Sequence, residues 1–177
     1  GTLGVLWDPA EIVRVGGSVT WSGTLKASPS EETKGDAERF QPPLVLRVGA
    51  AATLTTRLAA MANLSYSDWS GSSGIDPSAM TGANWSFGAG LEWGGARLGD
   101  RSLPIRFGYR RTDLPFRFGE ENPVESVLAA GLGINLRQIE TFSLARMDMA
   151  LERGSRNAGP VSETFTRMTV TLRLAGG

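Results

Sequence analysis

The chain has 177 residues with 18 basic and 18 acidic side chains, so its formal net charge is zero. This length suits one domain, and the balanced charge gives no electrostatic reason to expect nucleic acid as a partner. Histidine and cysteine are both absent, which excludes a Ser-His-Asp triad, a cysteine nucleophile, disulfides and the usual zinc ligands. We therefore expect no enzyme, no cofactor and no metal site.

No apolar run reaches the roughly 18 residues that a membrane-spanning helix needs, and no signal peptide is recognisable at Gly1. If the protein is exported, we expect its export signal upstream of Gly1. The 23 glycines are scattered through apolar stretches, which is typical of closely packed strands and not of a linker.

In chain order, the first clear alternation of apolar and polar residues covers 13–27. Apolar or small residues hold the odd positions: Val13, Val15, Gly17, Val19, Trp21, Gly23 and Leu25. Polar residues hold most even positions: Arg14, Ser18, Thr20, Ser22, Thr24 and Lys26. A period of two places these sets on opposite faces of a strand and fits no helix comparably well.

The same period predicts strands at 44–52, 85–93, 103–109, 128–136 and 168–174. Three further segments alternate less regularly, at 2–8, 58–69 and 142–153. The last of them also fits a helix with Leu144, Met147 and Leu151 on one face, although a strand is the preferred interpretation. The pattern therefore predicts about nine strands and no helix.

A soluble sandwich and a membrane barrel both give each strand one apolar face, but strand length separates them. Most segments here reach the roughly 9 to 11 residues of a membrane strand, whereas globular strands have about 5 or 6. Bacterial barrels also alternate short periplasmic turns with longer outer loops. Short links at 9–11, 54–57 and 137–140 alternate with long ones at 28–41, 70–83, 113–123 and 154–162, with a mid-length link at 95–101.

These features predict an all-β, antiparallel, up-and-down transmembrane β-barrel whose C-terminus lies on the short-turn side. Four tryptophans lie near expected strand ends, at Trp7, Trp69, Trp85 and Trp93. Such positions suit the interfacial aromatic girdles of a barrel, with ordinary packing as the alternative.

Several motifs carry a family resemblance: Ile105-Arg106-Phe107-Gly108-Tyr109-Arg110, Leu114-Pro115-Phe116, Gly131-Leu132-Gly133, Glu163-Thr164-Phe165, and a strand-turn-strand stretch over 49–69. Together they resemble the C-terminal region of FadL-like outer-membrane barrels, which transport long-chain fatty acids and hydrocarbons. The resemblance covers most of the chain and implies a fourteen-stranded barrel with an N-terminal plug. Residues 1–177 would then form the C-terminal part of one barrel domain, with the plug and the early strands upstream.

The odd number of strands agrees with a missing part, because single-chain bacterial barrels close with an even number. One feature departs from the family: such barrels commonly end in an aromatic residue, whereas this chain ends Leu174-Ala175-Gly176-Gly177. We therefore expect either an altered terminus or an atypical assembly signal.

Each strand has an apolar set of alternate residues, its apolar parity, and a polar set, its polar parity. If the apolar parity faces lipid, the polar parity lines the lumen. The candidates for lumen-facing residues are Arg14, Arg47, Asn63, Glu92, Arg106, Arg110, Arg146, Asp148, Glu152, Arg167 and Arg173, with Lys26 on the same parity as Arg14. They either form ion pairs that stiffen the barrel, which is the simpler interpretation, or offer an arginine fork to a carboxylate ligand. The acidic pairs Glu31-Glu32 and Glu120-Glu121 lie in expected outer loops, where a solvated surface is a simpler interpretation than a calcium site.

The architecture and the resemblance together predict passive uptake of hydrophobic small molecules, such as long-chain fatty acids, across the outer membrane of Gram-negative bacteria. The expected partners are membrane lipid, lipopolysaccharide and the transported molecule; the oligomeric state stays open. The alternative is a barrel that anchors or shuttles exported proteins for a secretion system. An outer-membrane lipase or protease is a third hypothesis, for which the sequence offers no catalytic set.

Overall fold

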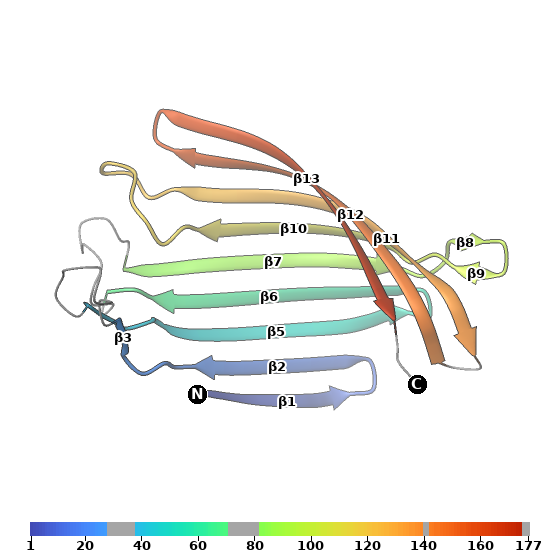
Figure 1. The fold of residues 1–177 in the computed structure, drawn as a ribbon. Coiled ribbons are helices and arrows are strands. Elements are labelled where there is room, and N and C mark those ends of the chain that lie inside the picture. The colour runs from blue at the N-terminus through green and yellow to red at the C-terminus, as the bar shows by residue number, and fades with distance from the viewer. Residues whose placement is uncertain (28–37, 71–81, 140–141, 175–177) are drawn as a thin grey trace.

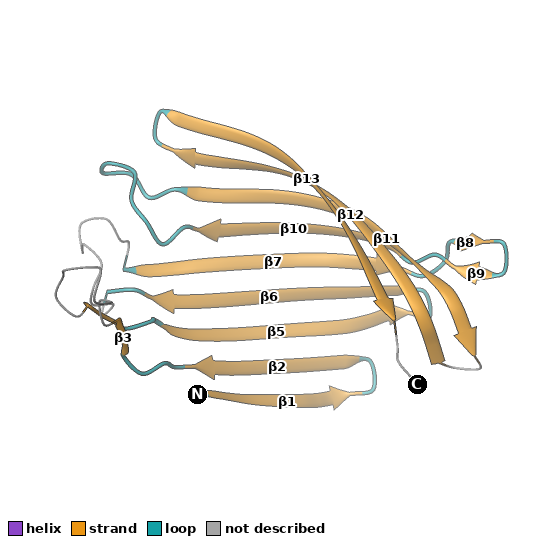
Figure 2. Cartoon of the chain, viewed as in Figure 1, coloured by secondary structure: helices purple, strands orange, loops and turns teal. Residues whose placement is uncertain are grey.

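The computed structural model describes residues 1–27, 38–70, 82–139 and 142–174. Within these ranges the chain contains strands and no helix (Figure 2). Nine strands form one antiparallel sheet in the order β1-β2-β5-β6-β7-β10-β11-β12-β13, so each strand pairs with the next one of the sheet along the chain (Figure 1). The predicted all-β class and the strand count are confirmed.

The strands of the sheet are β1 (Thr2–Ala10), β2 (Val13–Thr20), β5 (Leu44–Thr55), β6 (Leu58–Asp68), β7 (Ala83–Trp93), β10 (Ile105–Asp113), β11 (Val124–Ile139), β12 (Phe142–Ala158) and β13 (Val161–Leu174). Two short hairpins lie outside it: β3 (Leu25–Ala27) with β4 (Glu38–Phe40), and β8 (Arg97–Leu98) with β9 (Arg101–Ser102). The segment 142–153 is strand and not helix, because β12 pairs with both β11 and β13. Within the described residues β1 and β13 do not pair with each other, so the sheet is open.

The single strand expected over 13–27 is wrong. β2 ends at Thr20, which pairs with Val45 near the start of β5. Pro42 and Pro43 precede β5, and proline has no N–H with which to extend a ladder. The residues after Thr20 therefore lose β5 as a partner, and the alternation resumes in β3, which pairs with β4.

The long link expected over 154–162 is also wrong. β12 continues to Ala158 and β13 begins at Val161, so only Gly159 and Pro160 connect them. Gly159 has a φ of 55°, a conformation that glycine adopts without steric cost in a tight turn. The first four connections do alternate between short and long, and β13 runs toward the end of the sheet that carries the short turns at 11–12 and 56–57.

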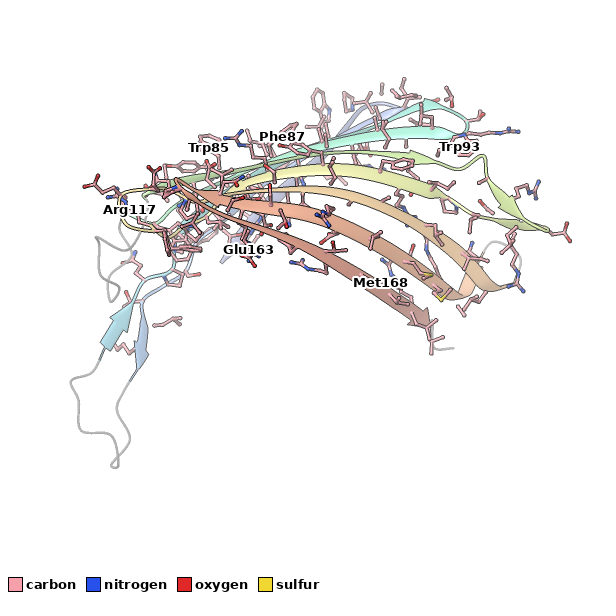
Figure 3. All side chains as sticks on the ribbon, turned by 90° about the horizontal axis from the view of Figure 1, so that it is seen from above. Trp85, Phe87, Trp93, Arg117, Glu163 and Met168 are labelled. Carbon is pink, nitrogen blue, oxygen red and sulfur yellow. The ribbon has the colours of Figure 1, made fainter. Side chains whose placement is uncertain are left out.

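The register of the ladder assigns every strand residue to a face, because directly paired residues share one. All eleven residues expected in the lumen lie on the same face. The sheet is curved, and Trp85, Phe87 and Trp93 project from its convex side (Figure 3). The polar face is therefore the concave one.

No second layer covers the convex face within the described ranges. Large apolar side chains there are exposed, with Val48 57%, Phe107 59% and Val170 54% accessible to solvent. Among the described residues the buried apolar side chains are Pro123, Val127, Ile134 and Ala158. A soluble sandwich would hide such a face against a second sheet, and the described residues contain no second sheet of comparable size.

Candidate functional site

A hollow of about 710 Å³ lies at the centre of the concave face. Its lining includes six glycines from five strands, at Gly16, Gly49, Gly88, Gly90, Gly108 and Gly131. Its polar lining includes Thr169, Thr171 and five residues of the predicted set: Arg14, Asn63, Arg106, Arg110 and Asp148. The site therefore combines a mostly apolar, side-chain-poor floor with a few charged groups.

Four charged residues form one network beside this hollow. The Nε of Arg106 donates to Glu92 Oε2 at 2.6 Å, and its Nη1 donates to Asp148 Oδ1 at 2.7 Å. Arg146 completes a fork on Asp148, with Nε 3.0 Å from Oδ2 and Nη2 3.0 Å from Oδ1. Two cations and two anions thus neutralise one another across β7, β10 and β12.

This network passes over β11, which separates Arg106 from Asp148. Gly133 of β11 pairs with Asp148, and a Cβ at this position would lie 2.5 Å from Asp148 Oδ1 and 3.0 Å from Arg146 Nη2. The missing side chain provides the space in which two non-adjacent strands form an ion pair. Sequence analysis named Gly133 only within the motif Gly131-Leu132-Gly133 and assigned it no structural role.

A second network is centred on Glu125, which is 7% exposed. It accepts hydrogen bonds from Arg110 Nη2 at 2.9 Å and from Arg156 Nε at 2.7 Å. Arg156 also lies 3.7 Å from Glu163. Sequence analysis missed Glu125 because it adjoins a loop, and missed Arg156 because its segment was interpreted as a link. The available signal was that both continue the polar parity of their strands.

The ring of Phe165 lies within cation–π distance of Arg156, a cation of this second network, and of Arg167. The guanidinium carbons of Arg156 and Arg167 are 4.9 Å and 5.5 Å from the ring centroid. Gly154 is the cross-strand partner of Phe165, and a side chain there would clash with the ring. Arg167 Nη1 is 3.3 Å from Glu152 Oε2, an ion pair that lacks hydrogen-bond geometry.

The remaining predicted residues lie apart from these networks. Arg14 pairs with Asp8 at 2.8 Å, and both side chains are more than half exposed. Arg47 and Arg173 form no ion pair within the described part of the chain, and Asn63 stands beside Gly88. Lys26 lies in β3, outside the sheet.

In the described ranges no three carboxylate, histidine or cysteine side chains converge as metal ligands. Glu31 and Glu32 lie outside the described residues, whereas Glu120 and Glu121 lie in the link between β10 and β11. Among the described residues there is no helix that is long and apolar enough to cross a membrane.

No protein-family model matches the chain, and no curated protein matches it in sequence. The resemblance to FadL-like barrels therefore stays a prediction.

Proposed function

We propose that this chain forms part of a transmembrane β-barrel of the bacterial outer membrane, through which hydrophobic small molecules such as long-chain fatty acids pass without a chemical step. In this proposal the convex face contacts lipid and the concave face lines the lumen. Strands outside the nine described here close the barrel.

The observation that carries the proposal is the diagonal course of the exposed apolar residues on the convex face. In β1 they extend from Leu3 to Trp7, and in β13 from Met168 to Leu174. The cross-strand pairs place Trp7 level with Thr166, which precedes the apolar part of β13. The band therefore descends by its whole height between the first and the last strand of the sheet.

Such a slope is what tilted strands produce when they cross a layer of constant thickness. Val5, at the centre of the band in β1, is level with Thr164, whereas the centre in β13 is about seven residues further on. This shift is about 24 Å along the strands over about 38 Å across the sheet, a tilt of about 30°. Strands of outer-membrane barrels tilt by roughly 35–45°.

Aromatic residues mark both edges of the band, as in outer-membrane barrels. In β7, Trp85 and Trp93 lie at opposite ends of the strand, about 27 Å apart along it, and tilt reduces the height between them to about 23 Å. The apolar band of such barrels is about 25 Å tall. Tyr66 packs beside Trp85 with ring centroids 4.8 Å apart, which reinforces the girdle on the side of the long links.

The hollow on the concave face supports the uptake of an apolar molecule. Its volume of about 710 Å³ lies within the range of small-molecule sites, which are mostly apolar with a few polar groups that orient the ligand. Arg106 and Arg110 are occupied by carboxylates, so their charge stiffens the wall and leaves the small-residue floor open for a chain-like ligand.

Two neighbouring residues of β6 test the membrane part of the proposal. Ala62 lies on the convex face near the middle of the band and Asn63 on the concave face, and both are exposed. We expect Ala62→Arg to lower the free energy of unfolding in phospholipid by about 2–4 kcal/mol, and Asn63→Arg to change it by less than about 1 kcal/mol. Heat-modifiable migration and urea titration measure both. A full-length protein that stays soluble without detergent would disprove the membrane assignment.

Transport is tested separately with the full-length protein in cells that lack other fatty-acid uptake routes. We expect expression to increase entry of labelled oleate, and a bulky change on the hollow's floor, Gly49→Phe, to reduce it while the protein still reaches the membrane. If oleate entry does not change but export of proteins stops on deletion, the secretion-anchor alternative replaces uptake.

A further inference from the structure

On the convex face, the apolar band ends at two arginines on the side of the long links. Tyr109 is the last apolar residue of β10 on this face, and Arg111 follows it. In β12, Leu151 is the last one and Arg153 follows. Both arginines are exposed, and both stand at the first position beyond the band.

Neither guanidinium is neutralised by a carboxylate in the described structure. Arg111 makes no hydrogen bond or ion pair there, and Arg153 donates only to Thr166 Oγ1, at 3.3 Å. The concave face differs, because Arg110, the neighbour of Arg111 in the chain, is bound to Glu125 at 2.9 Å. Asp113 is the one described carboxylate on the convex face of β10–β13, and it forms no ion pair with Arg111.

Hydroxyl groups surround the two arginines. Ser126 is the cross-strand partner of Arg111, and Ser155 is the partner of Ser126. β11 is the one strand between β10, which carries Arg111, and β12, which carries Arg153. In β12, Arg153 is two residues from Ser155 and lies on the same face. The Cα atoms of Arg111 and Arg153 are therefore about 12 Å apart, a span that two long, flexible side chains can close around one headgroup.

We propose that Arg111 and Arg153, with the nearby hydroxyls, bind the phosphate groups of a phosphorylated lipid in the outer leaflet, whose acyl chains lie along the apolar band. This inference rests on the proposed function, since the convex face must contact lipid. The guanidinium fork matches phosphate oxygens, and serine and threonine hydroxyls add donors. Clusters of basic residues at a membrane surface attract anionic headgroups. The apolar band adjoining the cations favours a lipid over a free anion.

The test uses the full-length protein purified in uncharged detergent and titrated with bisphosphorylated lipid A, with binding measured by native mass spectrometry. We expect the double variant Arg111→Gln/Arg153→Gln to bind lipid A at least about tenfold more weakly. The control variant Arg57→Gln/Arg101→Gln removes two arginines near the opposite end of the sheet and should bind as the wild type does. Lipid A without phosphates should bind the wild type as weakly as the double variant binds the phosphorylated form.

Inorganic phosphate at millimolar concentration should leave lipid A bound. Displacement by inorganic phosphate alone would overturn the lipid assignment in favour of a soluble anion, and equal binding by both double variants would overturn the site itself. If both variants insert into bilayers normally, either result affects this inference only. A wild-type protein that fails to insert would instead overturn the proposed function together with it.

Discussion

The concave face carries its charges differently in the two halves of the sheet. Over β7–β13, eight charged side chains form two compact networks, with Asp148 and Glu125 largely shielded from solvent, and Arg167 pairs with Glu152 beside them. Over β1, β2, β5 and β6, Arg14 and Asp8 form one exposed pair and Arg47 has no described partner. The same alternation in sequence thus produces cross-linked charges in one half and isolated charges in the other, while the glycine-lined hollow extends across both halves.

This difference shows that alternation alone does not determine how the charged side chains of a sheet face are arranged. Where opposite charges occupy neighbouring strands at the same level, they pair and hold the strands together. Where glycine, alanine and serine occupy those levels, the wall leaves space for a ligand.

The largest contrast is expected for loss of a carboxylate. Asp148→Ala leaves Arg106 and Arg146 without their shared partner in a partly shielded site, and we expect it to lower the free energy of unfolding by about 2 kcal/mol. Asp8→Ala removes one member of an exposed pair and should cost less than about 1 kcal/mol. Urea titrations of the full-length protein in detergent micelles measure both. Equal losses would show that the network does not stabilise its half of the sheet.

Two glycines of the concave face should respond to the same substitution in different ways. In Gly133→Ala the new methyl group displaces Asp148 from its arginines, so we expect a loss of about 1–2 kcal/mol. Gly49 has no atom closer than 3.5 Å to a Cβ, and Gly49→Ala should be neutral or slightly stabilising.

A double-mutant cycle tests the cause of the loss at Gly133. Gly133→Ala should cost less when Asp148 is already alanine, because the contact that it disturbs is then absent. Additive losses would place the effect of Gly133 in the backbone and not in the network.

A smaller effect is expected at the aromatic ring of the second network. Phe165→Leu removes the ring beside Arg156 and Arg167 and uncovers Gly154, which should cost about 1 kcal/mol. Phe165→Tyr keeps the ring and serves as the control. Thermal unfolding in micelles distinguishes the two, and an unchanged midpoint for the leucine variant would exclude a stabilising role for the ring.

The smallest effect on stability is expected at Arg47 of β5, in the half of the sheet with few charged side chains. Arg47→Ser removes a charge without a described partner, so the free energy of unfolding should change by less than about 0.5 kcal/mol. If anionic ligands pass this wall, entry of oleate should fall about twofold relative to oleyl alcohol, because long-range attraction of a carboxylate is lost. A clear loss of stability without a change in entry would place Arg47 among the structural residues.

Much of the fold could be predicted from the sequence because a period of two is a local property of a strand. Alternation alone identified the nine strands of the sheet, and it assigned all eleven candidate residues to one face. The strand boundaries predicted from the sequence were wrong at two places because of local composition. The prolines before β5 end the pairing of β2 at Thr20, and the polar residues around Arg156 belong to a ladder although they look like a loop.

The sequence by itself therefore determined the class of secondary structure and the face on which each side chain lies. Only the tertiary structure decided which residues stand at the same level on neighbouring strands, because a period of two leaves the register between strands undetermined. That register brings Asp148 to Arg106 across Gly133 and aligns Arg111 with Ser126. It also makes the apolar residues descend diagonally over the convex face, and this slope is a relation between strands that no single segment contains.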